Sequence, residues 1–404
     1  MVSSTIDHMV AVTAFLAATL LFIGLFNQTI QTAVIYQRHR ATATKASDLL
    51  DSILLSPGIP IDWGQTDVDP TGFGLQDPEF TQYMISPFSL MRLNSSTGQP
   101  VYYNVTGQWY SNITVGGRNF LLVPNSLSLN YSTATKLLGI TNAYGFQLTF
   151  EPIVSVSIEE TSSNPLTLKV TATGVGFPLA QATISYCFLK VVSSGPGSPT
   201  YDISFGTIAT DSAGSVSITI ADVGADDSYT FIAYARLSGL VGMGYHERTN
   251  LNAQYVVPFV DSIEDGRILL AHSYNVHVDP NPESSVFYTA TYVILAEDFT
   301  LREMPIITEK EKVVYGTGTN QTFGNITIPT HNPGFLILPY KTNTEDGVVL
   351  MPWGMSSLAF STTFGGDPSQ QEWVVTDMRH VTVGGIAYQA QIAVWSLEGY
   401  QVIS

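Results

Sequence analysis

Charge is scarce in this sequence, and basic charge is the scarcest. Only 12% of its 404 residues are Asp, Glu, Lys or Arg, about half the share of an average soluble protein. The 16 basic residues against 33 acidic ones leave a net charge of -17, which argues against binding to nucleic acid or anionic lipid through a basic face. Ser and Thr make up roughly a fifth of the chain instead, and such a surface suits an extracellular β-rich protein.

Cysteine is nearly absent too. The single Cys187 excludes an internal disulfide framework and any zinc site built from cysteines. It lies in the strand-like run TISYCFLK, where we expect an ordinary buried thiol.

Motifs of the common enzyme classes are missing as well. The chain has no G-x-S-x-G, no H-E-x-x-H, no G-x-x-x-x-G-K-[ST] and no G-x-G-x-x-G that opens a helix. His272 and His277 are five residues apart on a presumed strand, so they face opposite sides and cannot share one metal. We therefore expect no catalytic residues and no cofactor-binding residues.

A charge-free apolar run opens the chain. Residues 9–26 are numerous enough to cross a bilayer core of about 30 Å as a helix. No basic stretch precedes them and no A-x-A pattern follows them directly, so they do not resemble a cleaved secretory signal. Helical spacing of apolar residues continues up to Pro57, at Ile30, Val34, Leu49, Leu50, Ile53 and Leu54. The pattern predicts one helix over 1–56, roughly 75 Å long, apolar all round at first and amphipathic afterwards.

Two signals conflict over the side of the membrane on which the rest of the chain lies. Lys and Arg are absent before Arg38 and present after it, which by the positive-inside rule places the C-terminal bulk in the cytoplasm. The Ser- and Thr-rich composition and the glycosylation sequons point outside. We give the composition and the sequons more weight, because partner helices or lipid headgroups can neutralise a few basic residues on a helix.

Seven sequons of the form Asn-x-Ser/Thr occur, and Asn27 lies too close to the apolar run to be a good acceptor. The candidate glycosylation sites are Asn94, Asn104, Asn112, Asn130, Asn320 and Asn325. Four of them fall between residues 94 and 130, so we expect this region to form a glycan-bearing surface.

Residues 57–152 are punctuated by Pro, Gly and Asp, and they predict a small α+β collar packed on the second half of the helix. A short helix begins there with Ser132 or Thr133 as its N-cap. The loop DVDPTGFGLQDPE offers four carboxylates to a calcium ion, although its spacing departs from an EF-hand: Asp67, Asp69, Asp77 and Glu79. Solvated turn residues are the alternative interpretation of this loop.

Residues 153–250 predict a β-sandwich. Leu166, Leu168, Val170 and Ala172 alternate with polar residues, as in a half-buried strand. The tetrad DSAG at 211–214 is expected to close a hairpin. Residues 251–404 contain nine further strand-like runs, which indicate a second sandwich or a jelly-roll-like domain.

Three runs in the predicted sandwich carry a resemblance: GVGFPLAQATISY, GTIATDSAGSVSITI and YTFIAYARLSGLVGMGY. They resemble the immunoglobulin-like and carboxypeptidase-regulatory-like modules of prokaryotic surface proteins, over about a quarter of the chain. The resemblance implies spacing and adhesion, and it implies no catalytic residue.

The N-terminus carries a second resemblance. SSTID, an apolar half-helix, an amphipathic half ending in LLDSILLSPG and a β-rich head are similar to the type IV pilin-like surface proteins of archaea. Asp7 is fifth when counted from Ser3, where many pilins carry an acid that a neighbouring subunit's N-terminus neutralises. An acid just outside the bilayer edge is the plain alternative for Asp7.

Together these features predict a mainly β, single-pass membrane protein with its bulk outside the cell. We expect a structural or adhesive role, as a pilin-like subunit or an anchored spacer. Its partners would be the lipid bilayer, copies of itself through the helix, and surface glycans or other surface proteins. The alternative is a surface hydrolase of glycoside type, with two carboxylates in a cleft of the C-terminal domain.

Overall fold

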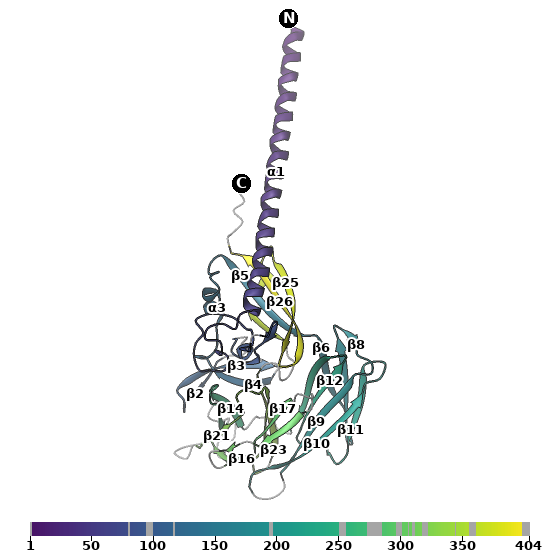
Figure 1. Cartoon of the computed structure of the whole chain (residues 1–404). Helices are drawn as coiled ribbons and strands as arrows, with labels where there is room; N and C mark the ends of the chain where they lie inside the picture. The colour runs from purple at the N-terminus through teal and green to yellow at the C-terminus, as the bar shows by residue number, and fades with distance from the viewer. Residues whose placement is uncertain are drawn as a thin grey trace.

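The protein is a mainly β head from which one long helix projects (Figure 1). The structure is a computed structural model, and the residues that it describes are 2–79, 81–93, 100–115, 118–193, 197–249, 256–272, 285–295, 301–305, 307–308, 312–316, 322–343, 345–354 and 361–397. The predicted fold class, a mainly β chain behind a long N-terminal helix, is confirmed.

Helix α1 (Val2–Leu54) is continuous over 53 residues. No Pro interrupts it, and threonine hydroxyls inside it bond back to the preceding turn, as Thr19 Oγ1 does to the Phe15 carbonyl at 2.8 Å. Its last turns pack on the head and bury Ala46, Leu49, Leu50, Ile53 and Leu54.

The predicted amphipathic half of α1 is only partly correct. Ile30 and Val34, which we expected in the contact with the collar, are 46% and 43% exposed. Both residues precede the contact with the head, which begins at Ala46, and no side chain between Ile6 and Lys45 is buried.

A five-stranded sheet lies under the end of α1, which packs on β25 and β26. Its strand order is β1 (Met84–Ile85), β25 (Val375–Val383), β26 (Ile386–Ser396), β5 (Tyr144–Pro152) and β24 (Thr362–Gly365). Phe146, Leu148 and Phe150 of β5 are fully buried, as their alternation predicts. The sheet joins strands from the two segments 57–152 and 251–404, which the sequence analysis treats separately.

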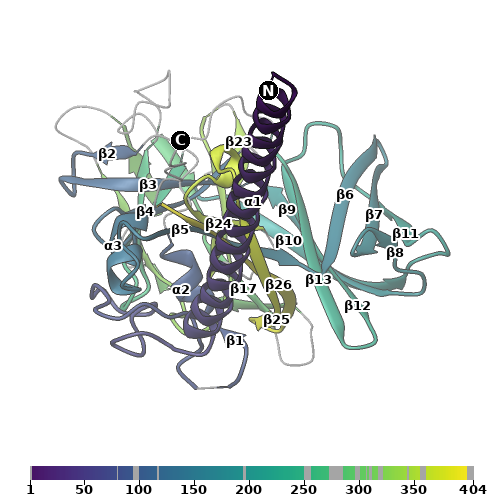
Figure 2. The ribbon, with the colours of Figure 1, turned by 90° about the horizontal axis from the view of Figure 1, so that it is seen from above.

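The segment between them forms a β-sandwich, drawn on the right in Figure 2. One sheet has the order β11 (Ser215–Ile220), β7 (Leu166–Gly174), β6 (Val154–Ser163), with β8 (Phe177–Pro178) added to β7. The other has the order β10 (Thr200–Ala209), β9 (Thr183–Val192), β12 (Tyr229–Leu237), β13 (Leu240–Arg248). Leu166, Leu168, Val170 and Ala172 are fully buried between the sheets, as predicted.

The turn at 211–214 does not close a hairpin, contrary to the prediction. It connects β10 to β11, which belong to opposite sheets. The turn itself is as expected, since Asp211 Oδ1 accepts from the Ser215 amide at 2.9 Å and Gly214 has a positive φ of 71°. Local sequence therefore predicts the turn, and the long-range partners decide which sheet each strand joins.

Two further sheets complete the head. The seven-stranded one has the order β19 (Ile307–Thr308), β21 (Gly324–Thr327), β15 (Arg267–His272), β14 (Val256–Ser262), β4 (Arg118–Pro124), β3 (Gln108–Val115), β2 (Val101–Tyr103). The other has the order β18 (Leu301–Pro305), β17 (Thr291–Leu295), β22 (Gly334–Lys341), β16 (Ser285–Tyr288), β20 (Val313–Tyr315), with β23 (Asp346–Trp353) on β22.

Short helices α2 (Pro87–Met91) and α3 (Tyr131–Leu137) and the 3-10 turn η4 (Pro368–Gln370) fill the connections. The helix α3 is where the sequence predicts it, but its N-cap is neither Ser132 nor Thr133. Asn130 caps it, with its side-chain oxygen 2.8 Å from the Thr133 amide. Asn and Ser are about equally favourable at the N-cap position, so side-chain type alone does not predict which of these residues caps the helix.

Candidate functional site

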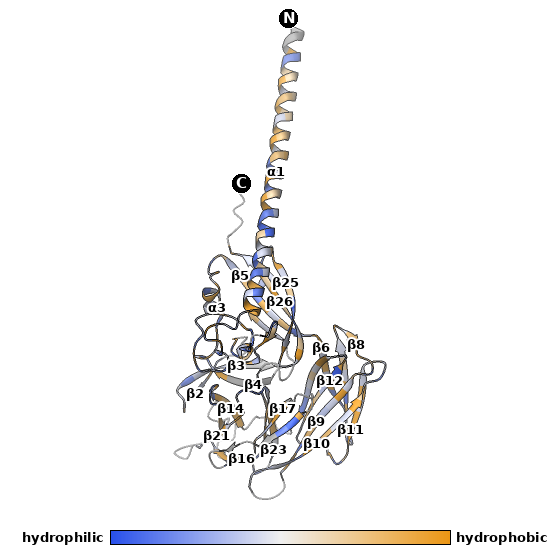
Figure 3. Cartoon of the chain, viewed as in Figure 1, coloured by the Kyte–Doolittle hydropathy of each residue, from blue (hydrophilic) through white to orange (hydrophobic). Residues whose placement is uncertain are grey.

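The most distinctive surface of the molecule is the exposed part of α1. Its residues from 9 to 37 carry no charge, and at 1.5 Å per residue these 29 positions extend about 44 Å. Figure 3 shows apolar residues along this part of the helix and hydrophilic ones where it meets the head. Within the described part of the chain, α1 is the one helix long and apolar enough to cross a bilayer, and its length and composition suit a membrane anchor or a signal sequence.

Asp7 lies exposed at the outer end of this run, one residue before His8. Every residue between this pair and Arg38 is uncharged. A helix of this length and composition matches the total thickness of a bilayer with its headgroup layers, about 40–45 Å. Asp7 therefore lies at the end of the charge-free run that is farther from the head.

An ion-pair network fixes α1 to the head. Arg379 on β25 donates to both carboxylate oxygens of Asp51, at 3.0 and 3.2 Å, and to Ser47 Oγ at 3.0 Å. It also donates to Asp377 at 2.8 Å. These hydrogen bonds, first that with Asp51, raise the pKa of Arg379.

The pKa of Asp377 responds to the same network. Partial burial pushes this pKa upward, but hydrogen bonds from Arg379 and from the Met378 amide outweigh it. The net pKa of Asp377 lies below its ordinary value. The junction therefore combines a paired, charged rim with buried apolar contacts.

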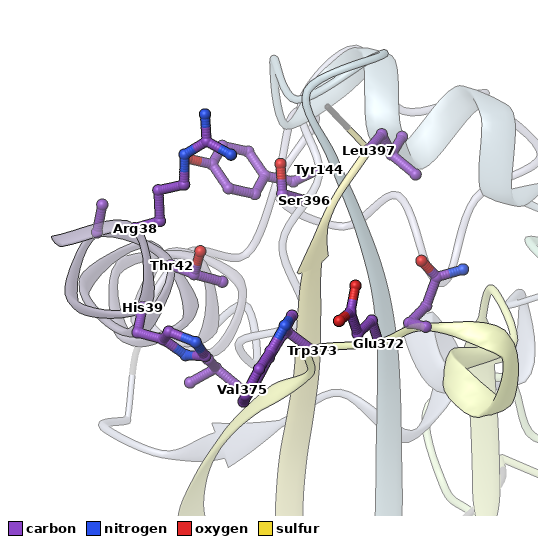
Figure 4. A pocket seen from close by; sticks show the side chains of 11 residues that line it. Arg38, His39, Thr42, Tyr144, Glu372, Trp373, Val375, Ser396 and Leu397 are labelled. Carbon is purple, nitrogen blue, oxygen red and sulfur yellow. The ribbon is translucent and has the colours of Figure 1, made fainter. Parts of the chain in front are cut away.

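A cavity of about 280 Å³ opens where α1 leaves the head, between the helix and the ends of β5 and β26. Its walls include Arg38, His39, Thr42, Tyr144, Glu372 and Trp373. In Figure 4, Arg38 reaches toward Tyr144, while the His39 ring stands edge-on to Trp373, with centroids 4.4 Å apart. The cavity contains one carboxylate, whereas glycoside hydrolysis by the common mechanisms needs two.

A second hollow, of about 500 Å³, does contain two carboxylates, Asp77 and Glu79. Both come from the predicted collar, whereas the hydrolase alternative placed its pair in the C-terminal domain. Asp77 Oδ1 accepts a hydrogen bond from the Glu79 amide at 2.9 Å, which is an ordinary turn contact. His331 on the other wall faces Gln65, at 3.2 Å.

The four predicted calcium ligands have separate roles. Asp67 binds two groups at the end of β14, since its carboxylate accepts hydrogen bonds from Ser262 Oγ at 2.7 Å and from the Ile263 amide at 2.8 Å. Asp69 is exposed and lies 3.9 Å from Arg92, and Asp77 forms the turn contact with Glu79. Among the described residues, no group of three or more His, Cys, Asp or Glu side chains converges as a metal site would require.

Buried Arg92 organises this loop, and sequence reasoning missed it. Its guanidinium donates to the carbonyls of Trp63, Thr66 and Val68 and stacks over the Trp63 ring. Burial lowers the pKa of Arg92 to about 10, against the opposing effect of Asp69. The residue occurs in the unremarkable run LMRL, so no local pattern signals its role.

The sequons differ in accessibility. Asn104 is exposed in the turn after β2, and Asn130 is exposed while it caps α3. Asn325 lies in β21, and its buried side-chain oxygen has no hydrogen-bond partner among the described residues. Asn112 belongs to β3. Asn94 and Asn320 lie outside the described residues.

Cys187 is 1% exposed in β9, as predicted, and burial raises the pKa of its thiol to about 12. It is thus a core residue.

No protein-family model matches this sequence, and a search of curated proteins finds no similar protein.

Proposed function

We propose that the chain is a pilin-like structural subunit of the cell surface, anchored by α1 with its β head outside the cell. In the membrane, lipid covers the exposed part of the helix. After assembly, copies of the same helix replace the lipid, and the heads form the outer surface. The resemblance of the N-terminus to archaeal type IV pilin-like proteins supports this role.

The observation that carries the proposal is the length of the charge-free exposed run. A bilayer core of about 30 Å needs only about 20 helical residues, whereas 29 uncharged positions precede Arg38. Apolar side chains continue beyond those 20 and stay exposed on the isolated chain, at Ile30, Val34, Ile35 and Tyr36. Around a single anchor these side chains would lie beyond the hydrocarbon core, in the polar headgroup layer, whereas a bundle of such helices would bury them.

The junction supports the same role. Five buried apolar residues and the Arg379–Asp51 ion pair hold the helix at one angle to the head. A repeating assembly needs such an angle, because each head must be placed identically relative to its helix. A spacer would function equally well on a flexible linker.

Fractionation of cells tests the proposal. Surface structures are sheared off, separated from membranes, and the chain in each fraction is identified by N-terminal sequencing. We expect the chain in the sheared fraction, and protease treatment of intact cells should digest the head. A chain that remains wholly in membranes would favour the anchored spacer, and a head resistant to protease in intact cells would contradict the proposed side.

Asp7→Ala sharpens this test. If Asp7 pairs with a neighbouring subunit, its loss should lower the sheared fraction about tenfold or more, equivalent to about 1.4 kcal/mol, and leave membrane insertion unchanged. Asp48→Ala is the matched control, since Asp48 is an exposed acid of the same helix near the head. Equal behaviour of the two variants would contradict a role of Asp7 in assembly.

A further inference from the structure

The hairpin of β2 and β3 presents aromatic side chains on both faces. Tyr102 is paired with Trp109 and Tyr103 with Gln108 in the register of the two strands. The turn between them is closed by a hydrogen bond of 2.9 Å from the Gly107 amide to the Tyr103 carbonyl. Gly107 has a positive φ of 67°, which a glycine adopts without strain.

One face of the hairpin belongs to the core. Tyr103 and Tyr110 are buried, and the Tyr103 ring stacks on Phe259 with centroids 4.6 Å apart. Successive residues of a strand point to opposite sides, so Tyr102 lies on the other face. The exposed Asn104 is the first residue of the turn that follows Tyr103. Core packing thus explains the aromatic residues on the inner face of the hairpin, but not those on its outer face.

Two large rings lie together on that outer face. Tyr102 is 42% and Trp109 is 54% exposed, and their centroids are 5.2 Å apart. The exposed Asn104 follows Tyr102 by two residues and begins the sequon Asn104-Val105-Thr106. An exposed acceptor asparagine thus lies two residues from a two-ring surface on the same hairpin.

We propose that Asn104 carries an N-linked glycan whose first sugar lies against Tyr102 and Trp109. The C–H groups on one face of a pyranose suit the electron-rich face of an aromatic ring. The inference rests on the proposed location of the head outside the cell, where glycosylation of surface proteins takes place.

The modification is an ordinary transfer from a phosphate-activated, lipid-linked oligosaccharide, catalysed by a cellular glycosyltransferase. A bond forms between Asn104 Nδ2 and the anomeric carbon of the sugar. The bond from that carbon to the phosphate oxygen breaks, the phosphate leaves with the electron pair, and a base of the glycosyltransferase takes up the one proton that the amide nitrogen loses.

Three other sequons lack this combination. Asn325 has a buried side-chain oxygen, and Asn130 uses its own to cap α3. Asn27 lies within the charge-free part of α1. Asn104 is the one acceptor among these that is exposed in a turn with an exposed ring two residues before it.

A glycan here would also protect the sheet. In the described strands, β2 is the last of its seven-stranded sheet, and the hairpin lies on the side of the head away from the sandwich (Figure 2). Exposed edge strands pair readily with other chains. A sugar over Tyr102 and Trp109 would cover both the apolar rings and the approach to that edge.

Mass spectrometry of glycopeptides from the protein isolated from its own cells tests the site. We expect Asn104 to be modified. A glycan on another sequon with Asn104 bare would overturn this inference and leave the proposed function standing. Bare asparagines at every sequon would also overturn it, and protease digestion of intact cells then decides separately whether the head is outside.

Thermal unfolding tests the contact with the rings. Removing the glycan by Asn104→Gln should lower Tm by about 2 °C, and by less than half as much when Tyr102→Ala and Trp109→Ala are already present. Phe177→Ala is the control, since Phe177 is 74% exposed on β8 of the sandwich. An equal loss of Tm on glycan removal in all backgrounds would contradict the ring contact.

Discussion

Helix α1 is buried at one end and exposed along the rest, although both parts are rich in apolar residues. From Ile6 to Lys45 no side chain is buried, whereas five apolar side chains between Ala46 and Leu54 enter the core of the head. The buried part carries charges such as Asp48 and Asp51, and the exposed part has none from residue 9 to 37. Apolar content alone thus does not reveal which part packs on its own chain. The placement of charge does, because a helix with a polar face has one side for the head and one for water.

The largest expected effect comes from shortening one leucine in each part. Leu50→Ala should destabilise the head by about 2–5 kcal/mol, because Leu50 is fully buried. Leu20→Ala, at a position that is 69% exposed, should leave stability in detergent unchanged. Chemical denaturation followed by near-ultraviolet circular dichroism measures both. Equal losses of stability in the two variants would contradict the difference in burial between the two parts of α1.

The ion pair at the junction should contribute less. Arg379→Met and Asp51→Asn each remove one side of a pair whose side chains are 25% and 39% exposed. A double-mutant cycle on the same denaturation assay should give a coupling of about 0.5–1 kcal/mol, since exposure weakens such pairs. Lys190→Met, which breaks the pair with Asp227 in the sandwich, should show no coupling with Asp51→Asn. Zero coupling between Arg379 and Asp51 would mean that apolar contacts alone stabilise the junction.

A smaller effect is expected from acid. The pKa of Asp377 is lower in the folded protein than its ordinary value of 3.8, so its ionised form stabilises the junction. This contribution is complete above the unfolded pKa and is lost as the pH falls through the folded pKa. Between pH 5 and pH 2, Asp377→Asn should therefore lose less stability than the unaltered protein. Identical pH profiles would exclude a role for Asp377.

Local patterns predicted the elements that depend on local physics. The absence of Pro before residue 57 predicted the long helix, and the alternation from Leu166 to Ala172 predicted a strand buried on one face. The turn at 211–214 was also correct as a turn.

Long-range pairing was not predictable in this way. Strand β26 pairs with β5 across more than 200 residues, for example Ile392 with Leu148, and no local pattern records such a partner. For the same reason the turn at 211–214 was assigned to a hairpin. The acidic loop was not predictable for the same reason. Asp67 accepts hydrogen bonds from Ser262 and Ile263, which are almost 200 residues away in the sequence.

A thiol on the exposed part of α1 tests most directly whether other copies of the helix cover it. Val34→Cys adds such a thiol, and the native Cys187 is too deeply buried to interfere. After oxidation of sheared surface material, we expect covalent dimers through residue 34 and none from Phe177→Cys on the sandwich. A Val34→Cys chain that stays monomeric and reacts freely with a membrane-impermeant maleimide would contradict assembly through this helix.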